Sequence, residues 1–323
     1  MTEYLIRRIL QSILVLFLIS LVTFGLIHAA PGGPTQMMIS PGMSPAAAKV
    51  QMHNLGLDKS VPEQYWIWIK NLLTGDLGKT FKNNIPVGDI LWPTMKNTFV
   101  LMSFSWVISM IIAIPWGIYN STKPYGISDQ TANFVSYVGF AMPAFWFGII
   151  LQQIFSLQLN WLPLSDMYAM DKQGNFIDLL YHLILPCSVL ILANLAAYSK
   201  YSRSSMLEVL EQDYIRTARA KGVPERKVIF RHALRNALIP IITVLGMELP
   251  SLVVGATLTE SVFNWPGMGR LFVDMARARE YSVLMAIALV TAVVVVLGNL
   301  IADILYKLVD PRVQLGRKGG KSA

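Results

Sequence analysis

Few residues in the sequence have the types and spacing that catalysis or metal binding would need. The four histidines, His28, His53, His182 and His232, are scattered, and Cys187 is the single cysteine. One cysteine excludes an intrachain disulfide and a metal site built from paired cysteines. The sequence contains no His-Glu-x-x-His pattern and no nucleophile-elbow pattern, so these two kinds of hydrolytic centre are excluded as well.

A short segment near the C-terminus, Gly319-Gly320-Lys321-Ser322, has the last residues of a phosphate-binding loop. A complete loop needs its first glycine at position 315, where this chain has Leu315, and a strand before it. We therefore expect a chain that binds no nucleotide, other cofactor or metal itself, and that is not an enzyme.

Positive charge is the strongest chemical signal, and it concentrates in residues 200–236. This basic segment holds nine of the 27 lysines and arginines. It is predicted to form two helices, because Gly222 suits a left-handed cap after Lys221 and Pro224 suits the first turn of the next helix. The second helix carries apolar residues among basic ones, so the segment either lies on anionic lipid or docks onto a cytoplasmic partner. Spacing alone does not decide between the two.

The elements that must position this segment are membrane spans. Of the 323 residues, 54% are hydrophobic and 14% charged, whereas globular domains average about 25% charged residues. This composition excludes a disordered chain and argues against a soluble fold. A spanning helix needs about 20 apolar residues, and six stretches qualify: Ile9–Ala30, Phe99–Asn120, Ala132–Gln158, Leu179–Ser199, Ala237–Phe263 and Ser282–Tyr306. The first is longer than the apolar core of a signal peptide, so we interpret it as a retained anchor.

The distribution of cations sets the orientation of these spans. Six spans place both termini on one side, and 17 of the 27 lysines and arginines lie on that side. Cytoplasmic loops carry the excess of such residues. We therefore expect both termini and residues 200–236 to be cytoplasmic, and residues 31–98 to form a long extracytoplasmic segment. Its aromatic stretch, residues 65–69, is either a peptide-binding surface or, more simply, an interfacial belt or packed cap.

Two strings in the basic segment are distinctive: residues 213–222 read DYIRTARAKG and residues 231–240 read RHALRNALIP. They resemble the EAA loop of ABC-importer permeases, most of all the B-type subunit of the oligopeptide/dipeptide/nickel subfamily. Further strings follow in the same order along nearly the whole chain: Arg7-Arg8, Pro31-Gly32-Gly33-Pro34, Leu55-Gly56-Leu57-Asp58, Gly75-Asp76-Leu77-Gly78, residues 260–271 (ESVFNWPGMGRL) and Asp310-Pro311-Arg312.

The chain departs from the general loop pattern at two places. The general loop has Glu-Ala-Ala six residues before its glycine, where this chain has Arg216, Thr217 and Ala218. It also has a proline thirteen residues after the glycine, where this chain has Arg235. Ala218 and Gly222, which shape the turn, are retained. A contact specific to the missing glutamate is therefore without support here.

The resemblance implies an all-α polytopic membrane protein with six transmembrane helices of the type I ABC importer permease fold. It implies a subunit of a bacterial or archaeal cytoplasmic-membrane importer that moves di- or oligopeptides, with nickel chelates or glutathione-like molecules as alternatives. The partners it implies are a C-type permease, two ATPases that bind ATP and Mg, and an extracytoplasmic substrate-binding protein, besides membrane lipid; no nucleic-acid partner is expected. The residues expected to contact an ATPase are Tyr214, Arg216, Thr217, Ala218, Arg219, Ala220, Lys221 and Gly222.

One carboxylate, Glu248, lies deep in the fifth predicted span. It is roughly 16 Å from the cytoplasmic end at about 1.5 Å per residue, and intramembrane carboxylates usually face a cavity or a partner. Small or polar residues recur at helical spacing after it, at Ser251, Gly255 and Thr259. A similar stripe lies on the third span, at Ala141, Ala144, Gly148 and Gln152. We expect Glu248, Ser251, Gly255, Thr259 and Gln152 to line the translocation path; the alternatives are close helix packing and, for Glu248, pairing with the second permease.

The predicted organisation has three parts: an N-terminal span with the extracytoplasmic segment (1–98), the permease transmembrane domain (99–310) and a cytoplasmic tail (311–323). We expect the 31–98 segment and the 264–281 loop to dock the binding protein or to cap the gate. Two other classes of membrane protein predict sequence patterns that differ from this one. An ion-coupled transporter would show inverted repeats and several intramembrane ionisable residues, and an intramembrane hydrolase would show a Ser–His or Asp–Asp pair; neither pattern is visible.

Overall fold

The described part of the chain is built from helices, with a single isolated bridge between Lys79 and Pro86 as its strand-type pairing. The computed structural model describes residues 2–29, 46, 50, 52, 53, 56 and 58–309. The predicted turns at 31–45, the string Asp310-Pro311-Arg312 and the 311–323 tail lie outside these residues. The helices are α1 (Thr2–Ala29), α4 (Val61–Leu73), α5 (Val87–Thr122), α6 (Ile127–Ala141), α7 (Ala144–Leu151), the π-helix η1 (Gln152–Gln158), α8 (Phe176–Leu210), α9 (Asp213–Ala220), α10 (Glu225–Lys227), the π-helix η2 (Val228–Ala233), α11 (Leu234–Met247), α12 (Ser251–Val254), α13 (Thr257–Val262), α14 (Met268–Ala278) and α15 (Tyr281–Val309).

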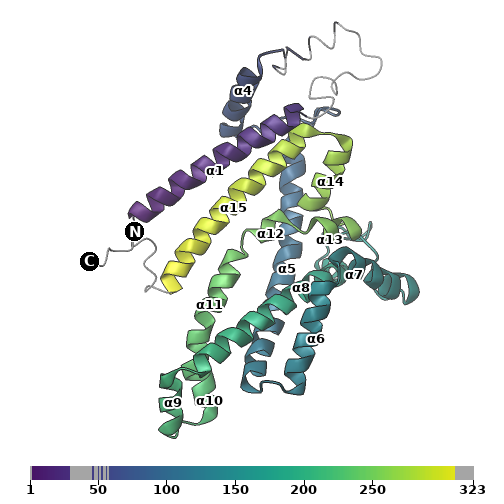
Figure 1. The fold of residues 1–323 in the computed structure, drawn as a ribbon. Coiled ribbons are helices and arrows are strands. Elements are labelled where there is room, and N and C mark those ends of the chain that lie inside the picture. Colours follow the sequence, from purple (N-terminus) through teal and green to yellow (C-terminus); the bar gives the residue numbers. More distant parts are fainter. Residues whose placement is uncertain are drawn as a thin grey trace.

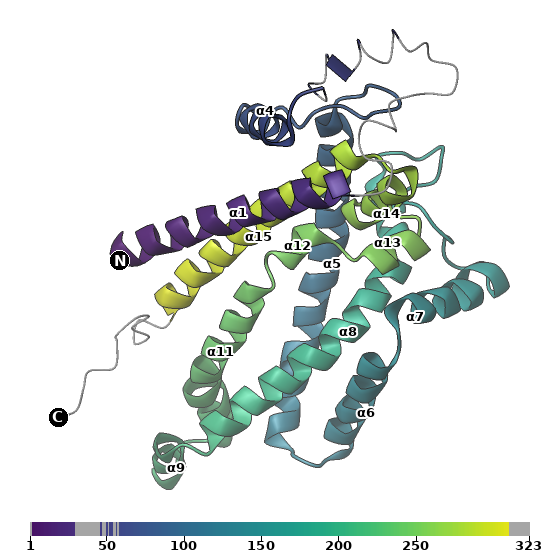
Figure 2. The ribbon, with the colours of Figure 1, turned by 45° about the horizontal axis from the view of Figure 1, so that its top comes forward.

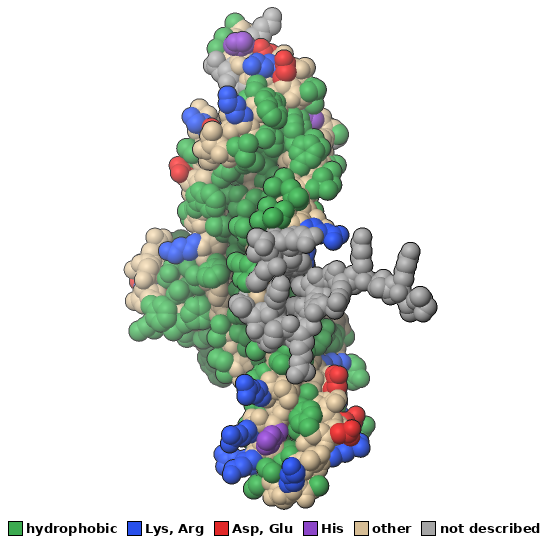
Figure 3. All heavy atoms as spheres, turned by 90° about the vertical axis from the view of Figure 1, so that its left-hand side faces the viewer, with side chains coloured by type: hydrophobic (Ala, Val, Ile, Leu, Met, Phe, Trp, Pro, Cys, Tyr) green, Lys and Arg blue, Asp and Glu red, His purple; other side chains and the backbone are tan. Residues whose placement is uncertain are grey.

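The arrangement of these helices is that of a multi-pass membrane protein. Within the described residues, five stretches are long and apolar enough to cross a membrane, and the bent pair α6–α7 makes a sixth when it is counted as one span. Helices α9 and α10 lie at one end of the molecule and α4 at the opposite end (Figure 1). Charged side chains gather at these two ends, and apolar side chains cover the surface between them (Figure 3).

The predicted third span, Ala132–Gln158, is not one straight helix. Helix α6 ends at Ala141, and the following helical stretch, Ala144–Gln158, is bent by 103° relative to it. The turn follows from Pro143, which has no N–H to continue the helix and which favours extended backbone at the residue before it. Met142 indeed has φ −87° and ψ 122°.

The predicted fifth span, Ala237–Phe263, is also broken. Helix α11 ends at Met247, the short α12 follows Pro250, and α13 begins at Thr257. Gly255 lies between α12 and α13 with φ 84° and ψ 173°, a region that residues with a Cβ rarely adopt. The glycine therefore allows the chain to change direction in the middle of the span.

The centre of the fold is the crossing of α5 and α8. A stripe of small residues at four-residue spacing is buried along α5: Ser105, Ser109, Ala113 and Gly117. A Cβ on Gly117 would stand only 2.4 Å from the carbonyl oxygen of Ser199 on α8. Small residues let membrane helices approach closely and gain van der Waals contact, which accounts for this stripe.

The aromatic residues of the 65–69 stretch form a packed cap on the end of α1. Phe24 of α1 contacts Tyr65 and Trp68 of α4, with ring centroids 5.3 and 5.7 Å apart. A hydrogen bond of 3.0 Å joins His28 Nε2 to Gln64 Oε1. The packed-cap interpretation of this aromatic stretch is the one that the contacts favour, and His28 has a structural partner there.

Two buried carboxylates fasten segments at opposite ends of the molecule. Glu280, which is 5% exposed, accepts hydrogen bonds from the backbone N–H groups of Phe81 (2.7 Å) and Lys82 (3.1 Å). Asp129, which is 2% exposed, forms an ion pair with Arg203, with Nε 2.7 Å from Oδ1 and Nη2 2.9 Å from Oδ2. The hydrogen bonds to Glu280 fix the 79–86 turn to the start of α15, and the ion pair between Asp129 and Arg203 fixes α6 to α8.

Candidate functional site

The basic segment forms a compact helical unit at the end of the molecule that we predict to be cytoplasmic. The predicted span ends at Ser199, and helix α8 continues beyond it to Leu210 before the chain turns back through α9. The first predicted helix, expected to run to Lys221, is thus split at Glu211 and Gln212. In Figure 1, α9 lies beyond the end of α8 and beside α10.

A small apolar core holds this unit together. Ile215 of α9 is fully buried in a cluster that contains residues of α8, η2 and α11: Met206, Val228, Ala233 and Ala237. The hydroxyl of Tyr214 also accepts a hydrogen bond of 2.8 Å from Asn236 Nδ2 at the start of α11. The position of α9 is therefore coupled to the start of the fifth span, since both share one core.

The opposite face of α9 is exposed and positively charged. Among the predicted contact residues, Tyr214, Arg216, Thr217, Arg219, Ala220, Lys221 and Gly222 are exposed and Ala218 is half-buried. The structure thus brings all eight together on one short helix and its C-terminal turn. Arg216, which replaces the glutamate of the general pattern, is exposed and lies 3.8 Å from Asp213 Oδ1.

The turn after α9 has the geometry that the sequence predicts. Gly222 has φ +75°, and its N–H donates to the carbonyl of Arg219 at 2.9 Å. No atom lies within 4 Å of a Cβ built on Gly222, so only its backbone conformation requires glycine. Across the turn, Arg219 donates two hydrogen bonds to Glu225, of 3.1 and 2.6 Å. These bonds to the Glu225 carboxylate raise the pKa of Arg219 above its usual value.

The residues predicted to line a translocation path do not lie on one continuous helix. Glu248 follows the end of α11 and is partly exposed, and its carboxylate is 3.4 Å from Ser251 Oγ. Thr259, on α13 beyond the break, is 2% exposed. Gln152 donates to the carbonyl oxygens of Leu164 (2.8 Å) and Val262 (3.1 Å). The single-face argument for this set fails because the span is broken; a role in a path stays a prediction.

The stripe of the third span packs closely against the fifth. A Cβ on Gly148 would stand 3.1 Å from Phe263 and 3.3 Å from Val262. Because Gln152 also bonds to Val262, the contacts here support the packing interpretation for this stripe. Within the described residues, no group of three or more His, Cys, Asp and Glu side chains is arranged to hold a metal ion.

The sequence matches the family described as the binding-protein-dependent transport system inner membrane component over residues 88–315. A second match, to the N-terminal part of such membrane components, covers residues 1–112. The chain belongs to this family. The permease is therefore a multi-pass inner membrane protein, and an ion-coupled secondary transporter or an intramembrane hydrolase does not fit this membership.

Two curated relatives match the permease along its whole length. It is 43% identical over 315 residues to the oligopeptide transport system permease protein AppB of Bacillus subtilis (strain 168), covering 97% of this chain and 100% of the relative. It is 38% identical over 336 residues to the dipeptide transport system permease protein DppB of Escherichia coli (strain K12), covering 97% and 99%.

A solved structure, an inward-facing conformation of the MetNI methionine ABC transporter, has the same fold. It superposes with a TM-score of 0.54 at 14% identity, covering 68% of this chain and 96% of that one. The permease thus has the predicted all-α fold of a type I ABC importer permease.

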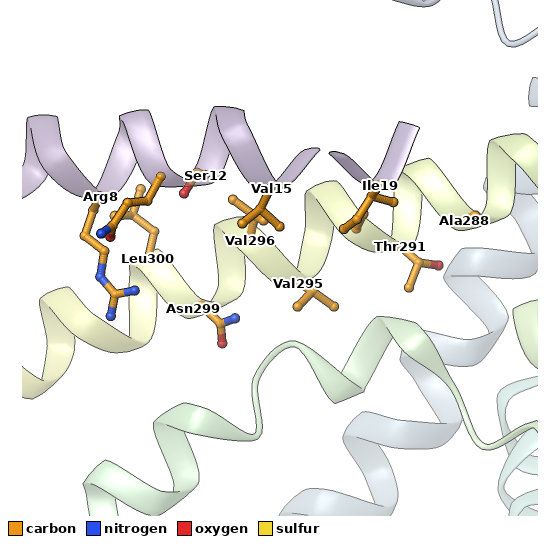
Figure 4. Close-up of a pocket in the computed structure, with 12 residues that line it drawn as sticks. Arg8, Ser12, Val15, Ile19, Ala288, Thr291, Val295, Val296, Asn299 and Leu300 are labelled. Atoms are coloured by element: carbon orange, nitrogen blue, oxygen red, sulfur yellow. The ribbon is translucent and has the colours of Figure 1, made fainter. Parts of the chain in front are cut away.

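A groove of about 430 Å³ runs between α1 and α15 of the permease. Figure 4 shows Val15 and Ile19 of α1 above Val295 and Val296 of α15, with Arg8 and Asn299 toward one end. Its walls are mostly aliphatic, as expected for a seam that meets lipid chains. The groove lies far from the helical unit of residues 200–236, called the α9 unit below, because α1 and α15 form a separate two-helix arm in Figure 2.

Two functional features of the α9 unit were not found from the sequence. Glu225 bonds to Arg219 across the turn, six residues away, and Asn236 bonds to Tyr214, 22 residues away. Each is a single polar residue whose partner is not evident from the sequence. Glu225 carried a detectable signal, since an acid in the first turn of a helix interacts with the helix dipole. Nothing in the sequence pairs Asn236 with Tyr214.

Proposed function

We propose that this permease is the membrane subunit of an ATP-driven importer of di- and oligopeptides, and that α9 with the Gly222 turn docks into a separate ATPase subunit. The observation that carries the proposal is the two-sided nature of α9. Its buried side shares a core with α8 and α11, and its exposed side presents Tyr214, Arg216, Arg219 and Lys221. A partner that displaces α9 therefore also displaces two spans.

The absence of a nucleotide-binding loop in the sequence fits this division of labour. ATP and Mg²⁺ belong to the partner ATPases, and this chain supplies the path. The further partners are a C-type permease, which completes the path, and an extracytoplasmic binding protein that delivers the substrate. The cation distribution supports a cytoplasmic position for both termini, in a bacterial or archaeal membrane surrounded by lipid.

The peptide substrate rests on the two curated relatives, which are named as oligopeptide and dipeptide transport permeases. Nickel chelates and glutathione-like molecules are the alternative substrates. For the basic segment, the alternative is adhesion to anionic lipid. The exposed face of α9 gives that alternative little support, because Tyr214 is the one residue of α9 that offers a large exposed side chain with apolar surface for insertion into a membrane.

Site-specific photo-crosslinking of the full-length, tagged permease in its native membrane tests the docking. A photoreactive residue replaces Thr217, which is exposed on α9, and a control replaces Tyr125, which is 84% exposed in the other cytoplasmic loop. We expect position 217 to link to a chain that hydrolyses ATP and position 125 to give no such product. Linking of position 217 to lipid, and to no protein, would establish the lipid alternative.

A further inference from the structure

Glu260 of α13 is a fully buried carboxylate that the proposed function does not use. Its side chain is 0% exposed. Oε1 accepts a hydrogen bond from the Thr98 hydroxyl at 2.8 Å, and Oε2 accepts two from the backbone N–H groups of Gly269 (2.7 Å) and Arg270 (3.1 Å). Burying a carboxylate costs free energy unless hydrogen bonds satisfy it. The three hydrogen bonds to Glu260 therefore stabilise its buried position.

The donors belong to the first turn of α14. The N–H groups at the start of a helix have no partner inside the helix. Here Met268 N–H donates to Thr98 Oγ1 at 2.7 Å, and the next two N–H groups donate to Glu260. The positive end of the helix dipole also favours a carboxylate at this position. One side chain from α5 and one from α13 therefore cap α14 together.

The surrounding backbone is built to admit this carboxylate. A Cβ on Gly267 would stand 2.5 Å from Glu260 Cδ, and a Cβ on Gly255 would stand 2.8 Å from Oε1. A second tie lies beside it, because Trp265 Nε1 donates to the carbonyl of Asn97 at 3.0 Å. At the point where α5, α13 and α14 meet, Gly255 and Gly267 thus leave the space that the Glu260 carboxylate occupies.

The contact between Glu260 and Thr98 lies beyond the break in the fifth span. The break at Gly255 separates it from α11, which is fixed to the α9 unit through the shared core. We propose that Glu260 and Thr98 form a latch that holds the start of α14 on α5, so that α13, α14 and α5 stay together as one body during transport. Glu260 and Thr98 are positioning residues in this sense. The latch itself is a structural claim, and its part in transport rests on the proposed function.

Hydrogen–deuterium exchange of the full-length permease in its purified complex measures the latch directly. Thr98→Val keeps the side-chain shape and removes the hydroxyl, whereas Thr98→Ser keeps the hydroxyl. Thr243→Val is a matched control on α11, because the Thr243 hydroxyl donates to the carbonyl of Ile239 in its own helix at 3.0 Å. We expect residues 268–270 to exchange about tenfold faster in Thr98→Val, as loss of a hydrogen bond to a charged group predicts. Thr98→Ser and Thr243→Val should exchange like the parent.

A second readout separates positioning from simple structural support. At equal amounts of assembled complex, the ratio of substrate-stimulated to basal ATPase activity should fall several-fold in Thr98→Val and recover in Thr98→Ser. Glu260→Gln, which keeps the shape of the side chain and removes its charge, should give an intermediate result, and it serves if Thr98→Val does not assemble.

Parental exchange of residues 268–270 in both Thr98→Val and Glu260→Gln would overturn the latch. Faster exchange with an unchanged ATPase ratio would overturn its part in transport. Failure of the parent complex to import any peptide would overturn the proposed function and leave the exchange test of the latch valid, since exchange does not depend on transport.

Discussion

Arg219 and Glu225 face each other across the Gly222 turn and are joined by two hydrogen bonds of 3.1 and 2.6 Å. Both side chains are partly exposed, at 43% and 55%. Exposed pairs of this kind contribute at most about 1 kcal/mol to stability. The pair therefore fixes the orientation of the Arg219 guanidinium on the surface of α9 more than it stabilises the fold.

The first prediction separates these two roles of Arg219. Arg219→Glu should abolish most of the substrate-stimulated ATPase activity, because it removes the ion pair and reverses the charge offered to the ATPase. The swap Arg219→Glu with Glu225→Arg restores an ion pair across the turn and keeps the reversed charge. We expect the swap to leave activity low, measured on equal amounts of complex. Full recovery in the swap would mean that Arg219 acts through the turn alone.

The second prediction concerns the backbone of Gly222. Gly222→Val should lower the stability of the turn by about 1–2 kcal/mol, because the left-handed conformation strains a β-branched residue. Gly222→Asn is the control, since asparagine tolerates φ +75° and the site has open space around a Cβ. Peptide uptake at matched complex levels should fall in the valine variant and stay near the parent in the asparagine variant. Equal uptake by both variants would remove the turn conformation from the coupling mechanism.

The third prediction is the topology. In a Cys187→Ala background, we place single cysteines at Met170, which is 98% exposed, and at Lys221. A membrane-impermeant maleimide should label position 170 in intact cells and position 221 only after permeabilisation. The reverse pattern would contradict the orientation that the cation distribution predicts.

The fourth prediction concerns Glu248, which follows α11 next to the break in the fifth span. If Glu248 lies in the path, Glu248→Leu should assemble normally and change the rate or substrate preference of uptake, with Glu248→Gln milder because it keeps a polar group. Transport assays with several peptides, at matched complex levels, measure this. Parental behaviour of both variants would exclude Glu248 from the path. Loss of assembly in the leucine variant alone would instead place it at an interface with the second permease.

The sequence predicted the turn of the α9 unit because its signals are local. Gly222 and Pro224 act through their own backbone preferences, and the structure gives Gly222 the left-handed conformation. The break between α8 and α9 at Glu211 and Gln212 was not predicted, because no glycine or proline marks it in the sequence.

The two broken spans could not be predicted by proline alone. Helix α5 remains one helix despite Pro93 and Pro115, whereas the chain turns sharply at Pro143. Neighbouring helices decide whether the freed backbone groups find partners, and that information is tertiary. The hydrogen bond between Thr98 and Glu260 could not be predicted for the same reason, because 162 residues separate the two side chains in the sequence.

The most direct test of the account is ATP-driven uptake by the complete complex reconstituted in proteoliposomes. The permease, its co-purified partner subunits and the binding protein are supplied with a labelled dipeptide on the binding-protein side and with ATP on the ATPase side. The account predicts accumulation of the dipeptide that requires ATP hydrolysis and is lost in Gly222→Val. Accumulation that follows an ion gradient and continues without ATP, or no accumulation of any peptide by an assembled, ATP-hydrolysing complex, would contradict it.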